Sequence, residues 1–290
     1  MRAVEIQAGI DPYDVLESGN ILVLPNAALM PAPEDREFLC GIRQDGGSYH
    51  KNIAYRPARG KISGTGQLPP PTVSRLRAVL QEYSRAAIAF TAGQLPRYEA
   101  RWRCDYASFR PVEERGRDLP FTKRNDLLHV DAFPTRPTNG GLILRIFTNI
   151  NPSENRVWIT SDPFAPLAAR CALDAGLARI ATPSPLDRVK RALGALGLPV
   201  KARSPYDRFM LAFHDYLKKN AEYQRGCPKY RFEFGPGVTW LVFTDVVPHS
   251  VESGQLAMEQ TMIVSRDSLA APDRAPIAIL EKLAGTRLSA

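Results

Sequence analysis

The run Asp126-Leu-Leu-His-Val-Asp131 alternates polar and apolar residues and is the most informative stretch of the chain. Such alternation is typical of a half-buried β-strand. Side chains two residues apart in a strand share one face, so His129 and Asp131 can reach the same point. Because the chain holds only four histidines, the position of each one carries information.

A second histidine, His249, lies far downstream, after a Gly235-Pro-Gly237 turn, the apolar run 238–244 and a short loop. Two imidazoles and one carboxylate on β-strands predict the facial triad of non-haem Fe(II) oxygenases, which leaves positions open for a cosubstrate and oxygen. A zinc or manganese ion in a cupin-like site is the alternative, as are histidines with no metal. His50 and His214 are weaker candidates: His50 is expected in a solvated loop and His214 on the surface of a helix.

The remaining pattern predicts strands before and after a helical segment. Strand-like runs occupy residues 20–24, 98–103, 126–131, 141–149, 229–234, 238–244 and 255–265. A helix with Thr72 as N-cap follows Pro69-Pro70-Pro71, and Ser184-Pro185 and Ser204-Pro205 each predict an N-cap with proline at the first helical position. We therefore expect a mainly β fold with helices (α+β). Its core would be a double-stranded β-helix, which is jelly-roll or cupin-like, in one domain over residues 1–290. A helical insertion at about 161–226 would separate the two metal-ligand segments, and a helix at about 275–284 would end the domain.

The charge balance favours an anionic partner. The chain has 38 Lys and Arg against 30 Asp and Glu, a formal charge of +8. It shows no basic run interleaved with aromatic residues, so a nucleic-acid partner is not expected. No run of about 18 apolar residues and no signal-peptide pattern is found, which predicts a cytoplasmic protein whose four cysteines are reduced thiols. Arg188, Lys190 and Arg191 predict either a helix that lies against an anionic membrane surface or an ordinary amphipathic helix.

An oxygenase of the predicted type also needs a cation for the far carboxylate of 2-oxoglutarate. Arg145 is the candidate, because it interrupts the apolar strand 142–147 directly after the His-x-Asp segment. A buried arginine is costly unless it meets an anion. The alternative is an arginine on the outer face of the sheet, paired with an acidic residue.

Several strings resemble the Kdo hydroxylase family, in which Kdo is 3-deoxy-D-manno-oct-2-ulosonic acid. The resemblance spans residues of about 20 to 270 and is carried by the strings at 51–56, 128–139 (LHVDAFPTRPTN), 144–152 (LRIFTNINP) and 244–261. It implies an Fe(II)/2-oxoglutarate-dependent dioxygenase that hydroxylates carbon 3 of Kdo in the inner core of lipopolysaccharide. It also implies that His129, Asp131 and His249 are the iron ligands.

One feature departs from the wider oxygenase superfamily, in which many members carry the cosubstrate arginine shortly after the second histidine. Residues 259–263 read Glu-Gln-Thr-Met-Ile, and the first base in this part of the chain is Arg266. This favours Arg145 as the residue that binds 2-oxoglutarate and keeps Arg266 as the alternative.

The resemblance also implies cofactors and partners. The expected cofactors are Fe(II), 2-oxoglutarate and O2, with ascorbate as a stimulant, and the expected acceptor is the anionic glycolipid Kdo-lipid A. Its candidate contacts are Lys51, Arg56, Lys123, Arg124 and Arg136. An oligomer is compatible with the sequence. The alternative functions are a 2-oxoglutarate oxygenase acting on another small molecule or a protein side chain, and a non-catalytic cupin-like binding protein.

Overall fold

The computed structural model describes residues 1–24, 29–44, 52–182 and 203–289. Four sequence predictions lie outside these residues: the solvated loop of His50, the substrate contact of Lys51, the helix after Ser184-Pro185 and the basic residues 188–191.

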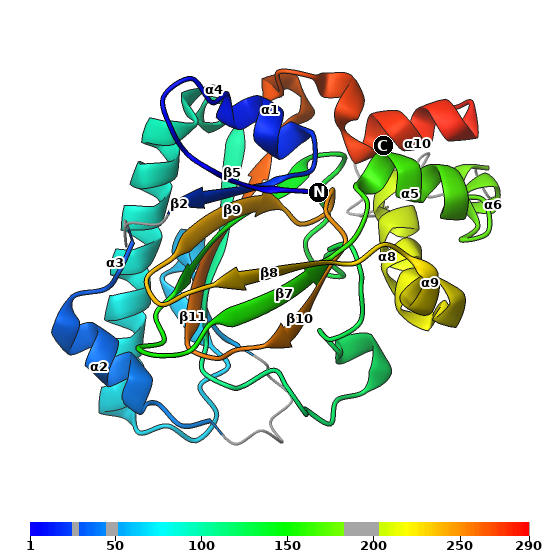
Figure 1. Cartoon of the computed structure of the whole chain (residues 1–290). Coiled ribbons are helices and arrows are strands. Elements are labelled where there is room, and N and C mark those ends of the chain that lie inside the picture. Colours follow the sequence, from blue (N-terminus) through cyan, green and yellow to red (C-terminus); the bar gives the residue numbers. More distant parts are fainter. Residues whose placement is uncertain (25–28, 45–51, 183–202, 290) are drawn as a thin grey trace, which may run out of the picture.

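Two sheets of mostly antiparallel strands form the centre of the protein (Figure 1). The larger sheet has eight strands in the order β1-β2-β9-β6-β11-β5-β3-β4, and the smaller has the order β10-β7-β8. The strands are β1 (Ala3–Glu5), β2 (Ile21–Leu24), β3 (Ile53–Arg56), β4 (Lys61–Ser63), β5 (Trp102–Arg110), β6 (Leu142–Asn149), β7 (Arg156–Thr160), β8 (Tyr230–Phe234), β9 (Thr239–Phe243), β10 (His249–Ser253) and β11 (Ala257–Val264). The mixed fold predicted from the sequence is confirmed, and the two sheets are consistent with the predicted jelly-roll core.

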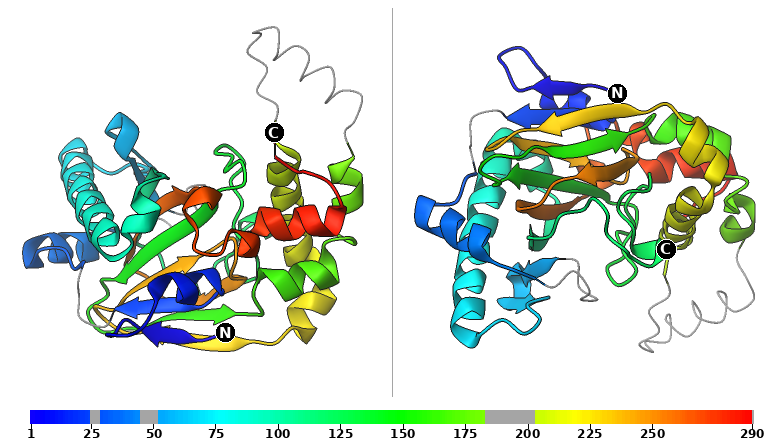
Figure 2. Two further views of the ribbon diagram at one scale, coloured as in Figure 1. Left: turned by 90° about the horizontal axis from the view of Figure 1, so that it is seen from above. Right: turned by 60° about the horizontal axis from the view of Figure 1, so that its bottom comes forward.

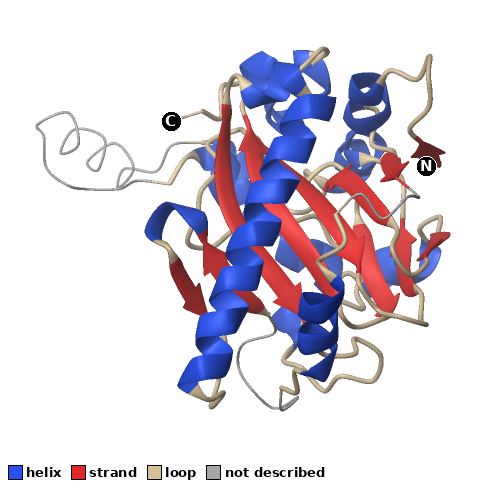
Figure 3. Ribbon diagram, turned by 90° about the vertical axis from the view of Figure 1, so that its left-hand side faces the viewer, coloured by secondary structure: helices blue, strands red, loops and turns tan. Residues whose placement is uncertain are grey.

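The helices occupy two regions outside the sheets. The long helix α3 (Pro70–Gln94) crosses the outer face of the larger sheet and buries Leu76, Leu80 and Tyr83 (Figure 3). Its Ser84 hydroxyl donates to Gln260 of β11 over 2.7 Å, which fixes this face against the helix. The other helices are α1 (Pro12–Glu17), α2 (Pro33–Gly41), α4 (Pro96–Glu99), α5 (Phe164–Cys171), α6 (Leu177–Ala181), α8 (Pro205–Lys219), α9 (Ala221–Gly226) and α10 (Pro276–Ala284).

Helices α5, α6, α8 and α9 form the predicted insertion between β7 and β8, and α10 lies beside them, away from α3 (Figure 2). As predicted, Ser204 caps α8: its hydroxyl accepts from the Asp207 amide at 3.1 Å. Two local predictions are wrong. Helix α3 starts at Pro70, two residues before the predicted N-cap Thr72, because consecutive prolines are tolerated in a first turn. Residues 98–101 are not a strand, because Pro96 starts the short helix α4, and β5 begins only at Trp102.

Aromatic side chains fill the space between the two sheets. Trp158 of β7 packs against Phe147 of β6 and Trp240 of β9, with ring centroids 5.0 and 5.7 Å apart. Phe234 of β8 stacks on Trp240 at 4.0 Å. Each of these rings is at most 2% exposed, so they hold the sheets together and form an apolar floor behind the site described below.

None of the helices in the described part of the chain has the length and apolar character needed to cross a membrane. The four cysteines form no disulfide with one another.

Asp245, in the turn after β9, is a buried carboxyl that ties this turn to β6. Its Oδ1 accepts from the Ile143 amide at 3.0 Å, while its Oδ2 is buried without a hydrogen bond. Burial raises the pKa of this carboxyl from 3.8 to about 7. The fold therefore favours the protonated form, and its stability falls as the pH rises between these two values.

We expect Asp245→Asn to remove that part of the pH dependence, because asparagine cannot ionise. As the pH rises from 3.8 to about 7, the free energy of unfolding of the wild type should fall further than that of the variant. The difference between the two decreases is at most about 4 kcal/mol. Chemical denaturation of the metal-free protein across this pH range measures the difference. The exposed Asp174→Asn is the matched control. Equal slopes for the wild type and both variants would contradict the prediction.

Candidate active site

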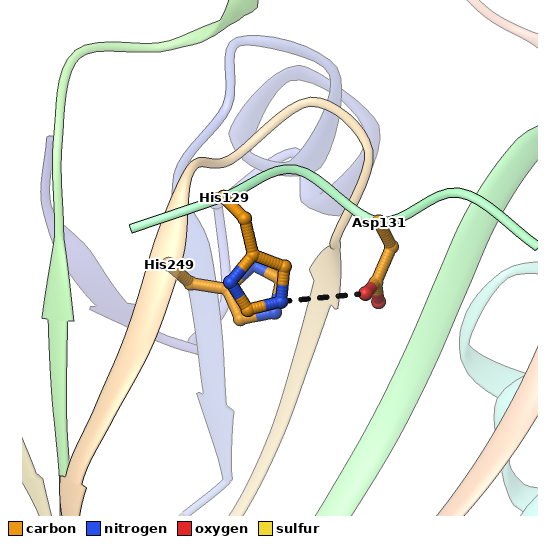
Figure 4. Close-up of side chains that lie close together, drawn as sticks. All are labelled: His129, Asp131 and His249. Atoms are coloured by element: carbon orange, nitrogen blue, oxygen red, sulfur yellow. Dashed lines mark ion pairs between the residues drawn. The ribbon is translucent and has the colours of Figure 1, made fainter. Parts of the chain in front are cut away.

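His129, Asp131 and His249 meet at one end of the smaller sheet (Figure 4). His249 is the first residue of β10, and its backbone exchanges two hydrogen bonds with that of His129, at 3.1 and 2.9 Å. The Asp131 amide donates to the Thr244 carbonyl at 2.9 Å. The strand predicted at 126–131 is wrong, since only this one β-bridge forms there. The backbone is nevertheless anchored on both sides of Val130, so His129 and Asp131 turn their side chains to the same point.

The donor atoms of the three residues are placed to share one ion. One ligand atom from each lies within 4.8 Å of the others, and His129 Nε2 is 3.8 Å from Asp131 Oδ1. In each imidazole the other nitrogen is engaged: Nδ1 of His129 contacts the Leu127 carbonyl at 2.7 Å, and Nδ1 of His249 contacts the Val247 carbonyl at 2.9 Å. A carbonyl can only accept, so both Nδ1 atoms carry the proton and both Nε2 lone pairs are free for a metal. The donor set therefore fits a divalent metal with positions left open.

The electrostatics of the three residues agree with this. Burial lowers the pKa of both His129 and His249, which favours the neutral imidazoles that a metal needs. Burial by itself would raise the pKa of Asp131. The Arg145 guanidinium, the two imidazoles and a hydrogen bond from the Thr244 side chain together outweigh burial and hold the pKa of this carboxyl far below its usual range. The site thus presents two neutral donors and one anion.

A chain of buried charges runs from Asp131 into the larger sheet. Arg145 Nη2 lies 3.2 Å from Asp131 Oδ2, and Arg145 Nη1 lies 3.6 Å from Glu259. Glu259 also accepts two hydrogen bonds from Arg110, at 2.8 and 2.6 Å. Arg145 therefore lies on the inner face, and both of its terminal nitrogens face carboxylates, which is the acidic pairing that the alternative interpretation expected on the outer face. Glu259 follows His249 by ten residues, in the segment where the sequence lacks a base.

Arg156, the first residue of β7, is a cation that the sequence analysis missed. It is completely buried, and its Nη1 donates to the Gly254 carbonyl at 2.9 Å. Its Nε and Nη2 have no hydrogen-bond partner, and the nearest carboxylate, Glu114, is 3.7 Å away. Burial, reinforced by Arg110, lowers the pKa of Arg156 to about 10. Arg156 begins the apolar strand Arg156-Val-Trp-Ile-Thr160. An arginine in an apolar strand is the pattern that indicated Arg145, so the same pattern could have identified Arg156.

A cavity of about 170 Å³ joins these groups. It is lined by Asn52, Arg110, Thr122, Asn125, His129, Asp131, Arg145, Phe147, Arg156, Trp158, His214, Lys218, His249 and Val251. Trp158 stacks on His249, with ring centroids 5.0 Å apart, and forms its apolar wall. Arg266, the alternative cation, is not in this cavity: it lines a separate cavity of about 880 Å³ and pairs with Asp273 and Glu281.

Two residues of α8 also reach the cavity. The prediction of a surface position for His214 is wrong: its ring lies 4.8 Å from that of His129, and its Nδ1 contacts the Val130 carbonyl at 2.8 Å. Burial lowers the pKa of His214 to about 4, and that of Lys218 to about 8. The helical period placed His214 on the polar side of α8, but this side packs against the segment that carries His129.

Similarity to known proteins assigns the chain to a family. The model of the 3-deoxy-D-manno-oct-2-ulosonic acid (Kdo) hydroxylase family matches residues 4–287. The chain belongs to the Kdo hydroxylase family. Among solved structures it resembles the Kdo hydroxylase KdoO, a non-haem Fe(II) α-ketoglutarate-dependent dioxygenase. The KdoO complex with α-ketoglutarate and Fe(III) is 32% identical, with a TM-score of 0.81, over 100% of this chain and 98% of KdoO. The complex with succinate and Fe(III) is 32% identical, with a TM-score of 0.82, over 99% of this chain and 97% of KdoO. No curated protein sequence gives a significant match.

In this member of the Kdo hydroxylase family, the predicted substrate contacts fall in two places. Arg56 and Arg136 lie in a neighbouring cavity that does not contain the three clustered residues. Lys123 and Arg124 line neither cavity, although their chain neighbours Thr122 and Asn125 line the cavity beside His129, called the metal cavity below. Arg124 pairs with Asp126 over 2.9 Å. The sequence grouped these residues by charge alone, and the structure brings only Arg56 and Arg136 together.

Proposed function

We propose that this protein uses Fe(II), 2-oxoglutarate and O2 to hydroxylate carbon 3 of Kdo in the inner core of lipopolysaccharide. The observation that carries the proposal is the buried cluster of His129, Asp131 and His249, with both Nδ1 atoms bound to carbonyls, in a chain of the Kdo hydroxylase family. Bound iron supplies the activation of oxygen, coupled to conversion of 2-oxoglutarate to succinate and CO2.

The residues around the cluster have separate tasks in this proposal. The Leu127 and Val247 carbonyls fix the tautomer and orientation of the two imidazoles. Arg145 keeps Asp131 ionised and oriented through its 3.2 Å ion pair. The Trp158 ring on His249 keeps bulk water from this side of the metal.

Two arginines are candidates for the far carboxylate of 2-oxoglutarate. Arg145 remains the proposal made from the sequence. Arg156 is the stronger candidate, because two of its nitrogens, Nε and Nη2, are buried without hydrogen bonds, whereas in Arg145 this holds for Nε alone. The Arg145 Nη2 also lies 3.2 Å from Asp131, closer than any carboxylate comes to Arg156. An incoming carboxylate would give Arg156 the charge-assisted hydrogen bonds that the protein does not.

The acceptor in this proposal is Kdo-lipid A, with Arg136, Arg56, Lys123, Arg124 and Lys51 as contacts. Such a glycolipid resides in a membrane, so we also propose peripheral contact with the cytoplasmic face of the inner membrane. We further propose that the chain acts as one oxygenase domain, since β1 and β11 belong to one sheet although they come from opposite ends of the chain.

The test is a coupled assay with purified protein, Fe(II), ascorbate, 2-oxoglutarate and Kdo-lipid A. We expect succinate to form in step with an acceptor product heavier by one oxygen atom, and ascorbate to raise the yield by keeping the iron reduced. Succinate without a modified acceptor would indicate that the protein is a 2-oxoglutarate oxygenase that acts on another substrate. If metal-loaded protein formed neither product, the oxygenase proposal would fail in favour of a binding protein.

A further inference from the structure

A second cavity, of about 520 Å³, adjoins the candidate active site. Three segments form it: the end of β3 with the turn Pro57–Arg59, the start of β5, and the loop that follows Asp131. We call this cavity the arginine groove. It is lined by Arg56, Pro57, Ala58, Arg59, Arg103, Cys104, Asp105, Tyr106, Thr135 and Arg136.

The arginine groove has a strong excess of positive charge. Four of its lining residues are arginines, and its one carboxylate, Asp105, pairs with Arg136. Among the described residues, no carboxylate forms an ion pair with Arg56, Arg59 or Arg103. The Arg56 Nε is buried and has no hydrogen-bond partner. Guanidiniums gathered without counter-charges repel one another, and an anion in the groove would remove that repulsion.

Phe133 lies close to one cation of each cavity. The guanidinium of Arg136, which lines the groove, lies 3.9 Å from the centroid of the Phe133 ring, and that of Arg145, which lines the metal cavity, lies 5.5 Å from the same centroid. Arg136 also lies 4.1 Å from the Tyr106 ring, so two aromatic rings fix its position. The two cavities are therefore close enough for one extended molecule to place one group at the metal and another in the groove.

We propose that the arginine groove binds a phosphomonoester of the acceptor, outside the sugar that is hydroxylated. This inference rests on the proposed function. A phosphomonoester carries nearly two negative charges at neutral pH and offers three acceptor oxygens. Planar guanidiniums bind such oxygens in pairs, which suits a groove with three arginines that lack carboxylate partners. The sugar carboxylate belongs nearer the metal, because it lies on the residue that reacts.

The test compares two acceptors, Kdo-lipid A with its phosphates and the same acceptor after phosphatase treatment. The variant is Arg59→Glu with Arg103→Glu, because both side chains are exposed and their loss leaves the core intact. We expect the KM of the phosphorylated acceptor to rise about tenfold or more in the variant. For the dephosphorylated acceptor, the wild type and the variant should have similar KM values.

Arg77→Glu with Arg85→Glu on α3 is the matched control, because it makes the same charge change at two exposed positions on the helix that covers the outer face of the larger sheet (Figure 3). Equal losses with both acceptors, or the same loss in the α3 double variant, would overturn the phosphate assignment, and so would an unchanged KM.

Direct binding of the two acceptors to Co(II)-loaded protein keeps this inference separate from the proposed function. Phosphate-dependent binding that the double variant loses, without any hydroxylation by the wild type, would contradict the function and support the groove. Hydroxylation with binding that does not depend on phosphate would contradict the groove alone.

Discussion

Asp131→Ala and His249→Ala should each lose the metal and reduce succinate formation by more than about 100-fold. Replacing residues that only orient metal ligands costs about 10–100-fold, so removal of a ligand itself should cost more. Each change takes one donor from a cluster whose ligand atoms lie within 4.8 Å of one another. Titration of the metal-free protein with Fe(II) or Co(II), followed by calorimetry, measures the loss of binding directly.

His214→Gln is the control for this experiment. His214 touches the His129 ring and lines the same cavity, but its Nδ1 is engaged by the Val130 carbonyl and it is not one of the three clustered residues. We expect this variant to retain the metal. Metal affinity that survives in Asp131→Ala, or that falls equally in His214→Gln, would rule out the proposed ligand set.

The parts of the fold that the sequence predicts are those decided by local pattern. The strand at 142–149 is recognisable because β-branched and aromatic residues fill it, and α8 because Ser204 and Pro205 define its start. The strand predicted at 126–131 fails for a different reason. Its alternation is real, but a strand also needs a neighbour along its length, and here β10 provides one bridge only. The sequence of one segment does not by itself determine which distant segment it pairs with.

The same limit applies to the site. The spacing of His129 and Asp131 is local, so the sequence could predict that they act together. The roles of the arginines depend on distances between strands far apart in the chain. Arg145 and Arg156 give the same signal in sequence, an arginine in an apolar strand. They differ in their neighbours. Arg145 lies 3.2 Å from Asp131 and 3.6 Å from Glu259. Arg156 donates to the Gly254 carbonyl, and its nearest carboxylate is that of Glu114, 3.7 Å away. That difference leads to a second prediction with a large expected effect.

Arg156→Gln should weaken the binding of 2-oxoglutarate by about 100-fold or more. Breaking a buried ion pair by removing one partner costs about 3–5 kcal/mol, and each 1.4 kcal/mol is a factor of about ten. The diagnostic ligand is 2-oxopentanoate, which has a methyl group in place of the far carboxylate. Its affinity should change little in Arg156→Gln, so the variant loses the preference for 2-oxoglutarate that the wild type shows. Calorimetry on Co(II)-loaded protein gives both affinities without turnover.

Arg145→Gln is the matched comparison, because it removes the same charge from the same cavity. Since Arg145 pairs with Asp131, this variant should weaken both ligands to a similar degree, through the metal, and keep the preference between them. Arg156→Lys should restore part of the preference, because it returns a positive charge without the planar donor pair. If Arg145→Gln alone abolished the preference, the far carboxylate would belong to Arg145, as the sequence first indicated. Because Arg156 is completely buried, the metal affinity of each variant must be measured alongside, so that a damaged fold is distinguished from a lost carboxylate contact.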